Sequence, residues 1–193
     1  LAVDMMRDLA AGGSVTGLLA AAYFYPYALM QLPAGLLSDS WGPRKTITVF
    51  FIIAAAGAVL LGLAPTVAWA IFGRTIVGIG AAMLFVPTLK ILAEWFQKRE
   101  FAYMTGLLLA MGGVGTLTAT APLVWLSSRM GWRNAFILVG GLTLVMAILV
   151  GLFVRNRPRE MGWPSPLEPA PSAAGPGIGL VEGMRRVVSC GAF

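Results

Sequence analysis

Long apolar stretches separated by short polar turns dominate this chain. Residues 9–38 and 46–73 contain no Asp, Glu, Lys or Arg, whereas the seven residues between them hold one acid and two bases. A run of about 20 apolar residues is long enough for a helix to cross the hydrocarbon core of a bilayer. The pattern therefore predicts two membrane-spanning helices joined by a tight, charged turn.

The same alternation continues along the chain and predicts an all-α integral membrane protein with five visible transmembrane helices. We place these spans at 14–38, 46–64, 67–93, 101–127 and 133–154, so that residues 1–154 form the membrane part. Residues 155–180 begin with bases and are then rich in proline, as expected of an extended linker. Residues 181–193 begin a further segment, and Leu180 to Cys190 are predicted to form an amphipathic helix.

Composition supports lipid as the solvent of this protein. The chain is 58% hydrophobic and 11% charged, whereas soluble domains carry about 25% charged residues. The net charge of +6 comes mostly from bases in short loops, so it predicts membrane orientation and no nucleic acid partner. The single cysteine and the absence of histidine predict no internal disulfide, no metal site and no cofactor.

The distribution of bases predicts how the chain is oriented. With the 39–45 turn inside, seven bases lie in inner loops and three in outer ones. The inner bases are Arg44, Lys45, Lys98, Arg99, Arg155, Arg157 and Arg159, and the outer ones are Arg7, Arg129 and Arg133. Because basic loops stay in the cytoplasm, residue 1 is expected outside and the C-terminal tail inside.

The charged turn after the first span carries specific chemistry. Gly35 permits close approach of another helix. Asp39 ends its helix at the pole where the helix dipole disfavours an acid, so it needs a nearby cation or the N-terminus of another helix. Gly42 helps to break the chain, and Arg44 and Lys45 supply positive charge beside the membrane.

This turn resembles the signature loop of the major facilitator superfamily, G-x-L-x-D-x-x-G-R-K, between that family's second and third helices. Gly35, Leu37, Asp39, Gly42 and Lys45 match it, and Pro43-Arg44 stands where the family has Arg followed by another base. A plain hairpin turn with topology-setting charge is the alternative. The resemblance implies helices two to six of an N-terminal half, with a first helix before residue 1 and a second half after the central linker. It also implies a bacterial inner membrane location.

Arg74 is the strongest candidate for binding a solute, because a charge within a span faces a cavity or a partner. Gly73-Arg74 with Gly78 and Gly80 resembles the family's fourth-helix motif, whose arginine is associated with proton coupling or anionic substrate. Some anion-transporting relatives carry a glutamate seven residues later, where this chain has Ala81. The alternative is an arginine that extends to the outer interface.

Four further polar residues are candidates for substrate or coupling. Tyr23, Tyr27 and Gln31 recur every four residues and so share one helix face with Gly35 and Asp39. They line a cavity in one interpretation, and form an interfacial tyrosine belt with one interhelical hydrogen bond in the other. Lys90 attracts an anionic solute as it leaves the transporter in one interpretation. In the favoured alternative its side chain extends to the membrane interface and neutralises Glu94 at i+4.

The resemblance implies a cytoplasmic gate made of the 35–45 turn and the charged turn Lys98-Arg99-Glu100. The alternative for the second turn is charge that only sets topology. The next helix is predicted to be tightly packed and bendable because it contains Gly106, Gly112, Gly113 and Gly115. In the family's antiporters this helix ends in Gly-Pro followed by a Gly-Gly pair, whereas here Ala121 precedes Pro122 and no such pair follows.

The predicted function is secondary active transport of a small organic anion by alternating access, coupled to protons as in a symporter. The style of the loops is closest to organic-anion and sugar-phosphate permeases. A transporter-like protein with a sensing or membrane-complex assembly role is the alternative. An enzyme is not expected, because no clustered acids or histidines offer a catalytic set.

Overall fold

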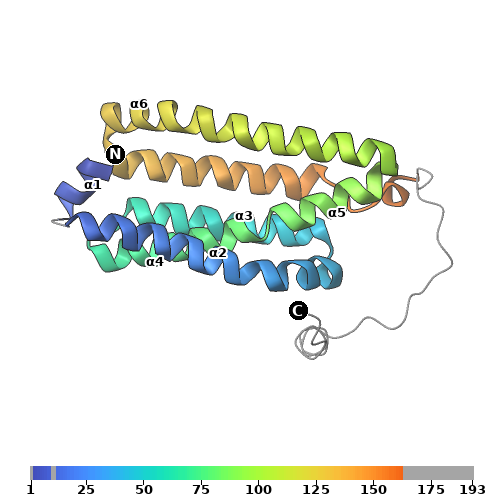
Figure 1. The fold of residues 1–193 in the computed structure, drawn as a ribbon, viewed down its shortest axis with the longest axis horizontal. Helices are drawn as coiled ribbons and strands as arrows, with labels where there is room; N and C mark the ends of the chain where they lie inside the picture. The colour runs from blue at the N-terminus through green and yellow to red at the C-terminus, as the bar shows by residue number, and fades with distance from the viewer. Residues whose placement is uncertain (1, 10–11, 163–193) are drawn as a thin grey trace.

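Helices make up nearly all of the structure, a computed structural model that describes residues 2–9 and 12–162. Their bounds are α1 (Ala2–Asp8), α2 (Gly13–Trp41), α3 (Pro43–Gly62), α4 (Val67–Ala82), α5 (Phe85–Trp95), α6 (Lys98–Phe153) and the 3-10 helix η1 (Pro158–Met161). The long helices run roughly along one axis and alternate in direction (Figure 1). The predicted linker beyond residue 162 and the predicted helix after 180 lie outside the described residues.

Helix α6 contains the last two predicted spans. Gly131, with φ 82° and ψ 156°, interrupts its helical backbone. Glycine enters this region of φ at little cost, so the chain can reverse its direction at Gly131. The helical segments 98–130 and 132–153 therefore run in opposite directions (Figure 1). The predicted turn at 128–132 is therefore confirmed.

Three helical segments combine the length and the mean hydropathy of a membrane span: Pro43–Gly62, Val67–Trp95 and Lys98–Phe153. Helix α2 is 29 residues long but is not among them. Its tyrosines, its prolines Pro26 and Pro33 and its Gln31 lower its mean hydropathy. The length of α2 is thus sufficient for a membrane span, but its polar side chains give it a lower mean hydropathy than the other three segments.

The third predicted span, 67–93, is not one continuous helix. Helix α4 ends at Ala82, and α5 begins at Phe85. Pro87 explains the break, because a proline has no amide hydrogen and its ring clashes with the carbonyl four residues earlier, here that of Met83. The sequence interpretation missed this interruption, which divides Arg74 and Lys90 between two helices.

Helix α3 is the centre of the packed part of the bundle. A Cβ added to Gly80 of α4 would lie 2.6 Å from the Ala54 amide nitrogen, and one added to Gly62 would lie 2.7 Å from the Arg133 carbonyl oxygen. Small residues therefore let α4 and the 132–153 helix approach the α3 backbone closely. Helix α2 packs against α4 in turn.

The 98–130 helix makes few such contacts. Most of its side chains between residues 102 and 125 are exposed. Among the described residues, no atom lies within 4 Å of a Cβ added at Gly106, Gly112, Gly113 or Gly115. The tight packing predicted for this helix is therefore not found within the described part of the chain.

Candidate functional site

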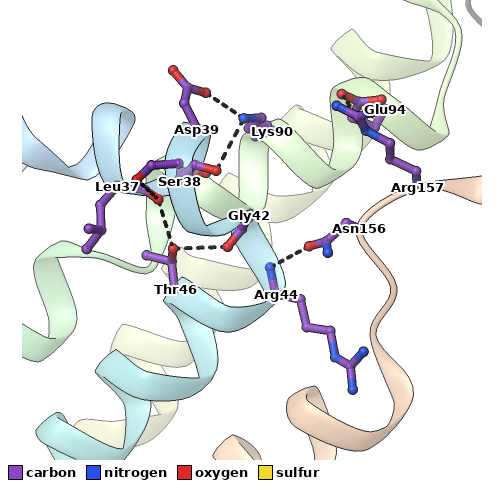
Figure 2. Close-up of polar contacts among 11 residues, drawn as sticks. Leu37, Ser38, Asp39, Gly42, Arg44, Thr46, Lys90, Glu94, Asn156 and Arg157 are labelled. Carbon is purple, nitrogen blue, oxygen red and sulfur yellow. Dashed lines mark hydrogen bonds and ion pairs between the residues drawn. The ribbon is translucent and has the colours of Figure 1, made fainter. Parts of the chain in front are cut away.

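The loop between α2 and α3 is held by an ion pair. The Asp39 carboxylate accepts a hydrogen bond from the Lys90 ammonium of α5 at 2.5 Å, and Lys90 also donates to the Ser38 carbonyl at 3.3 Å (Figure 2). Both acceptors belong to the last turn of α2, where a cation is favourable. Lys90 is thus the nearby cation that the position of Asp39 predicted.

The partner of Lys90 differs from the sequence interpretation, which paired it with Glu94. The Glu94 Oε1 atom instead lies 3.6 Å from Nε of Arg157, a residue in the segment that follows α6. Helix α5 packs against both α2 and α6, so Lys90 and Glu94 find separate partners that the i+4 spacing within α5 did not predict. Two ion pairs result: Lys90 of α5 pairs with α2, and Glu94 of α5 pairs with the segment after α6 (Figure 2). All four residues line one pocket.

This polar pocket has a volume of about 290 Å³. Its lining residues come from the end of α2, Gly42, the start of α3, α5 and the segment after α6. They are Asp39, Ser40, Trp41, Gly42, Pro43, Lys90, Glu94, Asn156, Arg157 and Glu160. The sequence interpretation missed Asn156, Arg157 and Glu160 as members of this site. A signal was present, because four spans separate the two segments and an even number returns the chain to the same side.

Two more residues of the loop have structural partners. Thr46, fully buried, donates its hydroxyl to the Gly42 carbonyl at 3.0 Å and lies 3.4 Å from the Leu37 carbonyl (Figure 2). The Arg44 guanidinium donates to the carbonyl of Gly151 on α6. Gly35 has open space beside it within the described residues, so the close approach predicted there is not found. Lys45 is exposed.

The turn Lys98-Arg99-Glu100 lies apart from the lining of the polar pocket. Glu100 accepts a hydrogen bond from the Gln97 amide at 3.2 Å, and the two residues form a capping box at the start of α6. Glu100 therefore has a structural role in starting helix α6. Lys98 and Arg99 are exposed, and their predicted gate role stays a prediction.

Arg74 lies within α4, between the bundle's two ends. Its guanidinium carbon is 5.7 Å from the centroid of the Phe136 ring on α6. Its Nε atom is buried and has no hydrogen-bond partner among the described residues. An unpaired buried donor on a charged group is costly, so this position is suited to an anion that completes its hydrogen bonds.

Two of the predicted tyrosines lie beside this arginine's helix. Tyr23 is within electrostatic range of Arg74, and its ring stacks on Tyr27 with centroids 5.8 Å apart. The α2 backbone at Tyr23 packs directly on Gly78, one turn after Arg74. Gln31 is half-buried and further along the same helix. Lys90 belongs to the polar pocket instead, so the structure separates it from Arg74.

Removing the Asp39 charge is expected to change stability very little. Asp39 is 71% exposed and Lys90 29% exposed, and exposed ion pairs contribute roughly 0–1 kcal/mol. We expect Asp39→Asn to lower the free energy of unfolding by less than about 1 kcal/mol at low salt, and by less still at high salt. Thermal unfolding at two ionic strengths measures this. A larger, salt-independent loss would show that the carboxylate has a buried partner.

Antiparallel apolar helices joined by charged turns define this chain as an integral membrane protein. A sequence profile described as "Major Facilitator Superfamily" matches residues 1–193. The chain belongs to this family.

Its relatives include transporters of organic acids. It is 29% identical over 145 residues to the probable sulfoacetate transporter of Cupriavidus necator, covering 75% of this chain and 34% of that one. It is 27% identical over 155 residues to the probable L-galactonate transporter of Escherichia coli, covering 80% and 34%. The hexuronate transporter of Escherichia coli is 26% identical over 159 residues, covering 82% and 37%. The chain thus spans 34–37% of these relatives.

One solved structure has the same fold. It is a bacterial homologue of the human lysosomal transporter Spinster, captured inward-facing and unoccupied, with a TM-score of 0.66 and 24% identity. The similarity covers 86% of this chain and 40% of that chain. At this identity it supports the arrangement of helices alone.

Proposed function

We propose that this chain is part of a secondary active transporter that moves a small organic anion across the bacterial inner membrane. The observation that carries the proposal is the buried, unpaired Nε of Arg74 within a membrane span. A guanidinium offers several donors in a planar fork that matches carboxylate and sulfonate oxygens. Sulfoacetate, galactonate and hexuronates, which name the relatives above, are all anions of this chemistry.

In this proposal residues 1–154 are helices two to six of an N-terminal half, and the solute pathway lies between this half and a second one. Tyr23, Tyr27 and Gln31 line the pathway near Arg74 and donate hydrogen bonds to solute hydroxyls. The loop from Gly35 to Lys45, Lys90 and the turn at 98–100 lie on the cytoplasmic side and act as the gate. Alternating access then exposes Arg74 to each side in turn.

We also propose coupling to a proton gradient. Helix α4 carries no acid, and Ala81 stands seven residues after Arg74. The proton acceptor therefore belongs to another part of the transporter in this scheme. Moving an anion inward against a negative membrane potential costs about 2.3 kcal/mol per charge per 100 mV, and a cotransported proton offsets this cost.

Uptake into proteoliposomes tests this function. The full-length transporter is supplied with labelled galactonate, glucuronate and sulfoacetate, and with the uncharged alcohol galactitol, with and without an inward proton gradient. We expect uptake of at least one anion, stimulated by the gradient, and none of galactitol. Equal uptake of anions and galactitol would contradict the anion selectivity. No uptake by a folded protein would favour a sensing or assembly role.

A further inference from the structure

The N-terminus of α3 has no cap of its own. The residue before the helix is Gly42, which has no side chain to accept a hydrogen bond, and the first helical residue is Pro43, which has no amide hydrogen. The first amide of α3 that needs an acceptor is therefore that of Arg44. Early amides of a helix have no partner within the helix, and a side-chain oxygen usually supplies one.

Asn156 supplies this oxygen from 112 residues away in sequence. Its Oδ1 atom accepts the Arg44 amide hydrogen with a nitrogen–oxygen distance of 2.8 Å (Figure 2). The asparagine side chain also packs on Gly42, where an added Cβ would lie 3.4 Å from Nδ2. Gly42 has φ +85°, a conformation that favours glycine, so its backbone and the asparagine fit together.

Asn156 is held in place by the segment after α6, residues 154–162, which we name the strap. Trp95 of α5 donates its indole N–H to the Arg155 carbonyl at 3.2 Å, and Arg157 pairs with Glu94. The Asn156 backbone amide donates to the Glu160 carboxylate at 3.3 Å, and Pro158 is buried. The strap is therefore fixed on both sides of the asparagine, which presents its side chain in a defined position.

We propose that the Asn156 side chain caps the N-terminus of α3 in place of Gly42 and is a positioning residue for the gate, holding residues 39–44 in the geometry in which Asp39 contacts Lys90. The cap joins three elements that are far apart in sequence: the start of α3, the end of α5 and the strap. With the cap made, they move as one body. The part of this inference that concerns gating rests on the proposed transport function, whereas the cap itself does not.

Hydrogen–deuterium exchange of the protein in lipid nanodiscs tests the cap directly. Asn156→Leu keeps the branched shape and the number of non-hydrogen atoms but removes the acceptor, and we expect exchange of a peptide covering residues 42–48 to become about five- to tenfold faster. Asn156→Asp keeps an acceptor and adds a charge that the helix N-terminus favours, so exchange at the wild-type rate is expected. Asn134→Leu, at an exposed asparagine beyond Gly131, is the matched control and is expected to change nothing in this peptide.

Uptake measured on the same variants tests the positioning role. We expect Asn156→Leu to lower the maximal rate about fivefold with an unchanged KM, and Asn156→Asp to restore the rate. Unchanged exchange in Asn156→Leu, or equally fast exchange in Asn156→Asp, would overturn the cap. Faster exchange with normal uptake would overturn the role in gating. A wild-type protein that transports nothing would remove the proposed function and leave the exchange result to decide the cap.

Discussion

Replacing Arg74 with alanine is expected to lower uptake of an organic anion at least about 30-fold, because removing one partner of a buried charge pair costs about 2–5 kcal/mol. The Nε of Arg74 is buried and unpaired within the described residues, and the aromatic face of Phe136 lies near its guanidinium. A bound carboxylate or sulfonate would therefore be its principal acceptor. Initial rates of proteoliposome uptake over a range of solute concentrations measure the loss.

Two variants make this prediction specific. Arg74→Lys keeps the charge but loses the fork of donors, so an intermediate loss is expected. Arg129→Ala removes an arginine that also stacks on an aromatic ring, that of Trp125, but is exposed near Gly131, so uptake close to wild type is expected. Equal losses in Arg74→Ala and Arg129→Ala would show a general effect of outer positive charge and would contradict a binding role for Arg74.

Replacing Gly78 with alanine is expected to destabilise the bundle by about 1–3 kcal/mol, the usual cost of overpacking a close contact. The added methyl group would meet the Tyr23 backbone, which has no flexible end to move away. Helices α2 and α4 would separate where Tyr23 lies beside Arg74. Uptake should therefore fall together with the unfolding temperature, which a thermal shift measurement reports.

Gly141→Ala is the matched control for this change. Gly141 is exposed on the 132–153 helix, and within the described residues nothing lies within 4 Å of an added Cβ. Alanine is favoured over glycine in a helix by about 1 kcal/mol, so an unchanged or slightly raised unfolding temperature is expected. Similar losses at both positions would attribute the effect to glycine flexibility, and not to contact between α2 and α4.

The alternation of long apolar runs and short polar turns was sufficient to predict where the long helices lie, because the bilayer sets the length of such runs independently of tertiary contacts. Where the pattern failed, a specific backbone effect was responsible. Pro87 divides the third span into α4 and α5, because its ring clashes with the carbonyl four residues earlier. The single apolar run 67–93 gave no sign of this break. Lys90 contacts Asp39 and not Glu94 because α5 packs against both α2 and α6, contacts that the apolar pattern did not predict.

The chemistry of the α2–α3 loop was predictable in part. The unfavourable position of Asp39 at a helix C-terminus implied a cation, and Lys90 is that cation. The roles of Asn156 and Arg157 were not predictable, since a cap and an ion pair supplied from a distant segment depend on how the helices pack. Arg74 was identifiable by its depth alone, whereas its contact with Phe136 required the fold.

Binding affinity tests the central claim, that Arg74 holds the acidic group of the solute, most directly. Dissociation constants of galactonate and galactitol are measured for the wild-type transporter and for Arg74→Ala, at constant pH and without a gradient. We expect the wild type to bind galactonate at least about 30-fold more tightly than the variant does, while galactitol binding is equally weak in both. Equal galactonate affinity in the two proteins would contradict it.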